Sequence, residues 1–250
     1  MMVRKKVRLF NTPIDALSLT DTVELVDNAI RNQQQLHHIA VNVAKIVHMQ
    51  TDRQLYESVV SADVINADGL PLVWVSKWLG DPIPERVTGV DLMQALVELA
   101  HEKGYKIFFF GAKEEVVLKV VKTYSDLYSS SIIAGYRNGY FTESEESTIA
   151  KQIAESGANI LFVAITSPKK ENFLFRQKEA LKSVNFVMGV GGSFDVVAGV
   201  VKRAPMWMQK AGLEWLYRIV QEPKRMWKRY LTTNTLFIYY LVKEIVKRKK

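Results

Sequence analysis

Residues 105–112 read YKIFFFGA, and this stretch decides the fold class. A continuous apolar run that ends at a glycine is typical of a strand buried on both faces of a parallel sheet. The preceding residues, 88–104, show helical spacing of apolar side chains, with Thr88 placed as N-cap and Gly104 as C-cap. The two segments together predict a helix that leads directly into a buried strand.

The same alternation continues in both directions along the chain. Ser18 and Asp21 are spaced as a capping pair at the start of an amphipathic helix. Further strands are predicted at 6–10, 38–43, 63–69, 131–136, 159–166 and 185–190, and further helices at 18–32, 43–60, 70–80, between 112 and 131, at 144–156 and from Pro168. This order predicts an α/β domain whose parallel sheet is covered by helices on both faces, a Rossmann-like arrangement.

Charge divides the chain into two parts. Residues 202–250 hold thirteen of the 34 basic residues and three of the 26 acidic residues, which leaves 21 basic and 23 acidic residues in the rest of the chain. The net charge of +8 therefore comes entirely from the tail. We predict an α/β domain over residues 1–200 and a basic, aromatic-rich helical appendage over 201–250, which faces an anionic partner.

Composition narrows the functional classes. The absence of cysteine excludes disulfides and cysteine nucleophiles and fits a reducing cytoplasm. We find no secretory signal pattern and no apolar run near the ~20 residues that span a bilayer. The four histidines lack metal-ligand spacing, and His37 and His38 are expected on a loop. Asp-x-Asp, the usual metal-binding device of nucleotide-sugar transferases, is absent, so we expect no metal and no cofactor, and arginine and lysine would neutralise a bound diphosphate.

Several polar residues follow predicted strands, where ligands of parallel α/β sheets bind. They are Asn42, Asp68, Gly111, the stretch 166–171 and the stretch 191–195. Asp68 suits a general base, although an aspartate before a glycine is also typical of a turn and of a helix cap.

Two further stretches favour an anionic ligand. Lys169 and Lys170 lie at a predicted helix start, where each cation costs about 0.3–1 kcal/mol against the helix dipole unless an anion binds there. The alternative is that both lysines are solvated at the surface. Gly191 and Gly192 allow a backbone to approach a ligand closely, but Phe194 interrupts the dinucleotide fingerprint and disfavours a nicotinamide enzyme.

The appendage contains EWLYRIVQEPKRMWKR at 214–229, which mixes aromatic rings with cations. Its prolines predict two or three short helices. This mixture is typical of helices in a membrane interface, where each basic residue contributes about 1 kcal/mol near anionic lipid. Nucleic acid would use a similar mixture, but the rest of the chain contains no recognisable nucleic-acid module, so we expect no nucleic-acid partner.

Seven motifs occur in a characteristic order. They are NADGLPLVW (66–74), RVTGVDLM (86–93), FFFGA (108–112), NGYF (138–141), SPKKENF (167–173), GVGGSFDVVAGVVKRAP (189–205) and GLEWLYRIVQEPKR (212–225). Together they resemble the WecG/TagA/CpsF family of bacterial glycosyltransferases, from about Val7 to Arg229. The resemblance implies an inverting, metal-independent transfer of N-acetylmannosamine or a uronic-acid-type sugar. The implied donor is a UDP-sugar, and the implied acceptor is a polyprenyl-diphosphate-linked sugar at the inner face of the cytoplasmic membrane.

The same resemblance implies residue roles. Asp68 is similar to the family's general base, and Arg218 and Arg225 match basic positions that would stabilise the departing diphosphate. The predicted substrate-binding residues are Asn42, Arg86, Gly111, Lys170, Glu171, Gly191, Gly192, Asp195, Arg218, Arg225, Lys228 and Arg229. Many members have glutamine where this chain has Lys170, and threonine where it has Ala40. The extra cation at Lys170 would suit an acidic sugar or a phosphate.

Two alternatives remain open. One is a nucleotide-sugar-binding protein of the same fold that does not transfer the sugar, and the other is a nucleic-acid-binding protein that uses the basic tail. A homo-oligomer is also compatible with the sequence.

Overall fold

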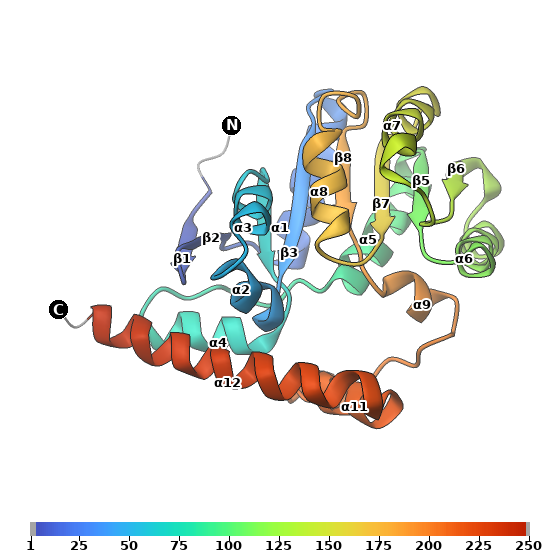
Figure 1. Cartoon of the computed structure of the whole chain (residues 1–250). Coiled ribbons are helices and arrows are strands. Elements are labelled where there is room, and N and C mark those ends of the chain that lie inside the picture. The colour runs from blue at the N-terminus through green and yellow to red at the C-terminus, as the bar shows by residue number, and fades with distance from the viewer. Residues whose placement is uncertain (1–3, 249–250) are drawn as a thin grey trace.

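The structure of the chain is a computed structural model that describes residues 4–248, without the side chains of Arg225 and Arg248. Its main sheet has six parallel strands in the order β4-β3-β8-β7-β5-β6 (Figure 1). The strands are β3 (Leu36–Val41), β4 (Val64–Ala67), β5 (Ile107–Gly111), β6 (Ile133–Arg137), β7 (Ile160–Ala164) and β8 (Phe186–Gly189). The predicted Rossmann-like parallel sheet is confirmed.

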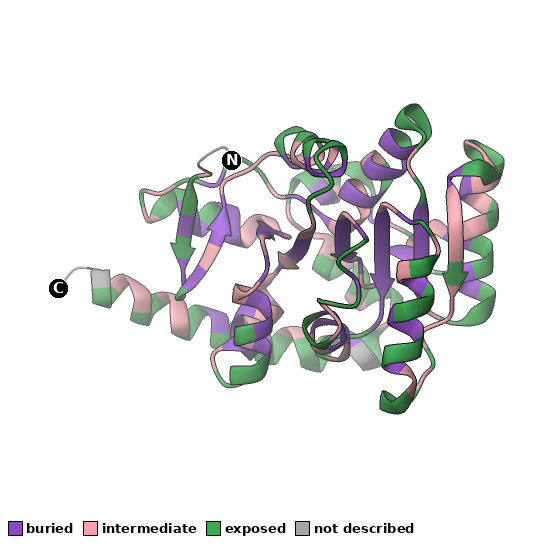
Figure 2. Cartoon of the chain, turned by 90° about the horizontal axis from the view of Figure 1, so that it is seen from above, coloured by how far each residue is buried: buried purple, intermediate pink, exposed green. Residues whose placement is uncertain are grey.

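Helices cover both faces of this sheet. One face packs against α1 (Leu19–Arg31), α5 (Gly89–Lys103) and α6 (Glu114–Leu127), and the other against α3 (Arg53–Val60), α7 (Glu146–Glu155) and α8 (Lys169–Arg176). Figure 2 shows the buried strands between helices whose outer sides are exposed. The predicted caps are confirmed: Ser18 and Asp21 form a capping box, Thr88 accepts from the Asp91 N–H, and Gly104 is left-handed.

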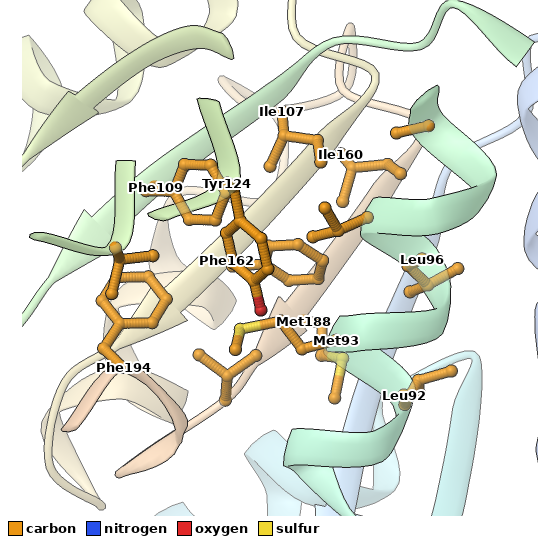
Figure 3. Close-up of a cluster of buried hydrophobic side chains, with 14 of the residues drawn as sticks. Leu92, Met93, Leu96, Ile107, Phe109, Tyr124, Ile160, Phe162, Met188 and Phe194 are labelled. Atoms are coloured by element: carbon orange, nitrogen blue, oxygen red, sulfur yellow. The ribbon is translucent and has the colours of Figure 1, made fainter. Parts of the chain in front are cut away.

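The stretch YKIFFFGA shows why a fully apolar strand is needed here. Phe109 packs with the helices of one face, while Phe108 and Phe110 pack with those of the other. Phe109 lies at the centre of an aromatic cluster, with Tyr124, Phe162 and Phe194 at centroid distances of 5.8–5.9 Å (Figure 3). Alternate side chains of a strand point to opposite faces, so a doubly covered strand must be apolar at every position.

The first predicted strand lies outside the main sheet. It is β1 (Lys6–Leu9), which pairs antiparallel with β2 (Thr12–Asp15), a strand that the sequence analysis did not predict. The carboxylate of Asp15 accepts a hydrogen bond of 2.8 Å from the backbone N–H of Ile65, which ties this hairpin to β4. Pro13 inside β2 hides the strand pattern, because proline is confined to edges and ends of sheets.

Three predicted elements need other corrections. The helix expected over 43–60 is two helices, α2 (Val43–Met49) and α3, because Asp52 caps a new helix start. The strand expected at 131–136 begins later, after the 3-10 turn η1 (Ser130–Ile132), and the helix expected at 144–156 is the turn η2 (Glu143–Glu145) followed by α7. A short helix, α9 (Ser193–Val197), follows β8.

The prediction that His37 and His38 lie on a loop is wrong. Both are buried in β3, and Nε2 of His38 lies 2.8 Å from Oδ1 of Asn66. Burial lowers the pKa of His37 to about 4 and that of His38 to about 3. Both imidazoles are therefore neutral at physiological pH, which is what allows them to occupy a central strand.

The appendage consists of α10 (Met206–Lys210), α11 (Glu214–Gln221) and α12 (Pro223–Arg248). The expectation of short helices holds for the first two, but α12 is 26 residues long and starts at Pro223. The inner side of α12 carries the buried residues Met226, Thr233 and Phe237, and the Phe237 ring lies 5.2 Å from that of Phe10. In Figure 1, α11, α12 and α4 (Leu70–Trp78) lie beyond the carboxyl ends of the strands. No helix within residues 4–248 is long and apolar enough to cross a membrane.

Candidate active site

Asp68 lies at the carboxyl edge of the sheet, between β4 and α4. Its backbone N–H donates to the carbonyl of Val41 at the end of β3, and the N–H of Val87 donates to the carbonyl of Ala67. These two bonds, 2.7 and 2.9 Å long, bring Asn42, Asp68 and Arg86 to the same edge. The residue that caps α4 is Gly69, with no side-chain cap bond, so the alternative reading of Asp68 as a helix cap is wrong.

Charged groups from several elements surround the Asp68 carboxylate. Burial raises the pKa of Asp68 above its ordinary value. Arg218 of α11 opposes this rise most strongly, Glu214 adds to it, and Lys45 and Arg86 oppose it further. A carboxylate with a raised pKa binds a proton more readily than an ordinary aspartate does, which is a property that suits a general base.

A buried ionic triad lies beside Asp68 at the same edge. Nζ of Lys45 lies 2.8 Å from Oε1 of Glu171 and donates to the carbonyl of Ala40 at the same distance, and Nζ of Lys170 lies 3.6 Å from Glu171. Burial alone would raise the pKa of Glu171, but the two lysines outweigh it and bring the pKa to about 2. Burial, with help from Lys45, lowers the pKa of Lys170 to about 8. The triad keeps one positive charge in excess near neutral pH.

Gly189 creates the space that Lys170 occupies. A Cβ atom at Gly189 would lie 2.5 Å from both Cδ and Cε of Lys170, so a side chain at the end of β8 would displace the lysine. Lys169 is also occupied: its Nζ donates to the carbonyl of Phe141 and lies 3.8 Å from the centroid of that ring. The alternative reading of Lys169 and Lys170 as two solvated lysines is therefore wrong.

A carboxylate of the chain itself offsets these cations at the start of α8. Glu171 lies in the first turn of the helix, where a carboxylate interacts favourably with the helix dipole. The helix start is therefore already occupied by a carboxylate of the chain. An anionic ligand would interact instead with the excess positive charge of the triad.

Asn42 holds one member of this triad, Lys45, in place. Its side-chain carbonyl accepts from the backbone N–H of Lys45 and caps α2, which starts the helix that carries Lys45. This cap therefore fixes the position of Lys45. Contact of the Asn42 amide with substrate stays a prediction.

The predicted glycine positions have backbone roles. Gly111 has φ of +131°, and a Cβ there would lie 2.5 Å from the backbone of Ala164, so only glycine lets β5 approach β7 this closely. Gly191, with φ of +55°, and Gly192 form the turn between β8 and α9. Asp195 lies in the first turn of α9, and its backbone carbonyl accepts from the N–H groups of Val200 and Val201. Contact of these positions with substrate stays a prediction.

Ion pairs join the appendage to the α/β domain. Arg86 bonds to the carboxylate of Glu214 at the start of α11. Arg203 donates two bonds, of 2.6 and 2.8 Å, to the carboxylate of Asp91 in α5, and its Nε lies 3.9 Å from Glu214. Bidentate pairs of this kind fix orientation as well as distance. They hold α11 over the carboxyl edge of the sheet.

The predicted appendage cations differ in their placement. Arg218 contributes the largest opposing charge at Asp68, so it lies near that carboxylate. Arg229 and Arg218 both act on the hydroxyl of Tyr230, whose pKa burial raises. Lys228 is exposed at the surface of α12. The side chain of Arg225 lies outside the described residues.

Four members of this site were absent from the sequence prediction. They are Lys45, Arg203, Glu214 and Tyr230. Tyr230 packs its ring 5.9 Å from that of Trp215, and its hydroxyl is close enough to Asp68 and Glu214 for their charges to affect its pKa. Glu214 could have been singled out from the sequence, because it is one of three acidic residues in a strongly basic segment.

Sequence comparisons agree with this geometry. The sequence model of the Glycosyl transferase WecG/TagA/CpsF family matches residues 7–250. One relative, from Bacillus subtilis (strain 168), is 37% identical over 200 residues, which cover 80% of this chain and 75% of the relative. Another, from Bacillus spizizenii (strain ATCC 23059 / NRRL B-14472 / W23), is 38% identical over 185 residues, covering 74% and 70%. Both are named N-acetylglucosaminyldiphosphoundecaprenol N-acetyl-beta-D-mannosaminyltransferase.

The family match spans nearly the whole chain, including the appendage that brings Arg218 and Glu214 near Asp68. The chain is therefore an enzyme, a glycosyltransferase that belongs to the WecG/TagA/CpsF family.

Proposed function

We propose that the chain transfers a sugar from a UDP donor to a polyprenyl-diphosphate-linked sugar at the inner face of the cytoplasmic membrane, with inversion and without a metal. The observation that carries this proposal is the position of Asp68, a carboxylate of raised pKa between cations of the α/β domain and Arg218 of the appendage. The acceptor lipid follows the names of the two Bacillus relatives. Synthesis of a cell-surface polysaccharide or a teichoic-acid-type polymer would use such a product.

The proposed reaction is a single displacement. The acceptor hydroxyl gives its proton to Asp68 while its oxygen forms a bond to the anomeric carbon of the donor sugar. On the opposite face, the bond from that carbon to the diphosphate oxygen breaks, and UDP leaves with the electron pair. Charge develops on the leaving diphosphate, and Arg218, Arg86 and the lysines of the triad are the described cations that can stabilise it.

A donor screen tests this function directly. We expect the purified chain to form a disaccharide lipid when a UDP-sugar and a short-chain polyprenyl-diphosphate N-acetylglucosamine are supplied, with the product identified by its mass. Binding or hydrolysis of UDP-sugars without transfer would instead favour the non-transferring protein of the same fold. A salt-dependent gel shift with nucleic acid, together with no transfer, would favour the nucleic-acid-binding alternative.

Lys170 is the position where we expect donor choice to be set. Replacing it with glutamine removes the excess charge of the triad while keeping hydrogen-bonding capacity. We expect Lys170→Gln to lower kcat/KM for a UDP-uronic acid roughly tenfold relative to UDP-N-acetylmannosamine, the size of one charge-assisted hydrogen bond. The measurement is kcat/KM for both donors with one acceptor.

Lys169→Gln provides the matched control for this substitution. It removes a lysine one residue away whose amine is held by Phe141. A preference for the neutral donor that is equal in the unmodified chain and in Lys170→Gln would contradict the charge argument and leave the reaction class untouched.

A further inference from the structure

All five tryptophans of the chain are exposed. Their exposed fractions are 52% for Trp74, 69% for Trp78, 64% for Trp207, 37% for Trp215 and 54% for Trp227. Tryptophan is on average one of the most buried residue types in folded proteins, and clustered exposed apolar surface marks a site of interaction. Three of the five lie in the appendage, but Trp74 and Trp78 lie in α4, which belongs to the α/β domain.

The tryptophans of α4 continue the surface of the appendage. A Cβ atom at Gly212, in the turn between α10 and α11, would lie 2.9 Å from Cη2 of Trp74, so the indole touches that turn. Lys77 and Trp78 follow Trp74 by three and four residues, which places all three on the same side of the helix. Lys77 is exposed as well. The opposite side of α4, with Leu72, Val73, Val75 and Ser76, is buried.

The outer side of α12 extends the same kind of surface. Its exposed apolar residues are Trp227, Leu231, Leu236, Ile238, Tyr239, Val242 and Val246. Exposed lysines lie among them, including Lys224, Lys228 and Lys243. The α4–appendage surface, meaning Trp74, Lys77 and Trp78 together with the exposed residues of α10, α11 and α12, is thus apolar and basic at once.

Charge identifies the partner of this surface. The core of a protein–protein interface is depleted in lysine, which argues against a second copy of the chain. A membrane interface accepts both components, because indole rings occupy the headgroup layer and lysines approach anionic lipid. The tail also holds the entire positive excess of the chain, which complements an anionic bilayer.

We infer that α4 itself docks on the anionic lipid surface beside the appendage, with Trp74 and Trp78 in the headgroup layer. This inference deepens the proposed function, on which it rests for the choice of a membrane-bound acceptor. It assigns a membrane contact to the α/β domain, whereas the sequence placed all such contacts in the appendage.

The position of α4 gives this contact a consequence for catalysis. The helix begins at Leu70, two residues after Asp68. Its length from Leu70 to Trp78 is roughly 12 Å, at 1.5 Å per residue. A docked α4 would therefore hold the candidate base at a fixed and short distance from the headgroups, where the diphosphate-linked sugar of the acceptor lies.

Vesicle partitioning tests the inference with the full chain. We expect the double variant Trp74→Ala/Trp78→Ala to bind vesicles of phosphatidylcholine and phosphatidylglycerol at least roughly tenfold more weakly, since two half-exposed indoles would lose their burial in lipid. Quenching of intrinsic fluorescence by brominated lipid should fall in the same variant, because two of the quenched rings are gone. Trp207→Ala/Trp227→Ala serves as the appendage comparison.

Leu118→Ala/Leu127→Ala is the matched control, because it removes two exposed apolar residues of α6. Unchanged partitioning of the α4 variant, with weakened partitioning of the appendage variant, would overturn the inference. Self-association that depends on Trp74 and Trp78, without vesicle binding, would also overturn it. Transfer to a water-soluble acceptor analogue should be unaffected in the α4 variant. Absence of that transfer in the unmodified chain would count against the proposed function and not against the docking of α4.

Discussion

Replacing Asp68 with asparagine should lower kcat by roughly 10²–10⁴-fold, the usual contribution of a positioned general base. The amide keeps the size of the side chain and cannot take a proton from the acceptor hydroxyl. The measurement is the steady-state rate with the donor and acceptor identified by the donor screen. Asp126→Asn, which changes an exposed aspartate on α6 paired with Lys122, is the control and should retain full activity.

The pH profile provides a second signature of the same role. A base must be ionised to act, and burial raises the pKa of Asp68, so kcat/KM should fall with decreasing pH at a higher pH than for an ordinary aspartate. This limb should disappear from the residual activity of Asp68→Asn. Near-normal turnover in the variant, or an unchanged acidic limb, would remove Asp68 from the base role.

Stability should change in the opposite direction to activity. A carboxyl whose folded-state pKa is raised stabilises the fold at pH values below its unfolded pKa, and this contribution is lost as the pH rises through the folded value. Above its folded-state pKa the ionised Asp68 is therefore a destabilising group, and Asp68→Asn should unfold at an equal or higher temperature than the unmodified chain. A lowered unfolding temperature would mean that the lost activity reflects damage to the fold.

The strands and the edge that holds the site could be predicted because their patterns are local. The apolar run of β5 and the caps at Ser18, Thr88 and Gly104 each follow from a few neighbouring residues. The rule that ligands bind at the carboxyl ends of strands then placed Asn42 and Asp68 together.

The features that were missed depend on distant contacts. Two adjacent histidines suggested a loop, but a side-chain partner 28 residues away and loss of charge made them tolerable in β3. The burial of Lys170 depends on the absence of a side chain at Gly189. The pairing of Glu214 with Arg86 spans 128 residues, and no local pattern indicates it.

Replacing Arg218 with glutamine should lower kcat by roughly 10²–10³-fold, even with a water-soluble acceptor analogue. This is the size of effect expected when one preorganised group that stabilises developing charge is removed. Arg218→Glu should lower turnover further, because it places a third carboxylate close to those of Asp68 and Glu214. Lys243→Glu, which reverses an exposed charge on α12, is the matched control for net charge and should leave turnover with the soluble acceptor intact.

Arg218 should also be recognised by its effect on Asp68. Its charge opposes the burial-driven rise in the pKa of Asp68 more than any other group, so Arg218→Gln should move the acidic limb of the pH profile to higher pH. A residue that only anchors the appendage to lipid would lower vesicle binding and leave that limb in place. A shifted limb together with lost turnover would therefore assign Arg218 to the active site. Lost vesicle binding alone would assign it to the membrane surface and remove it from the proposed stabilisation of the diphosphate.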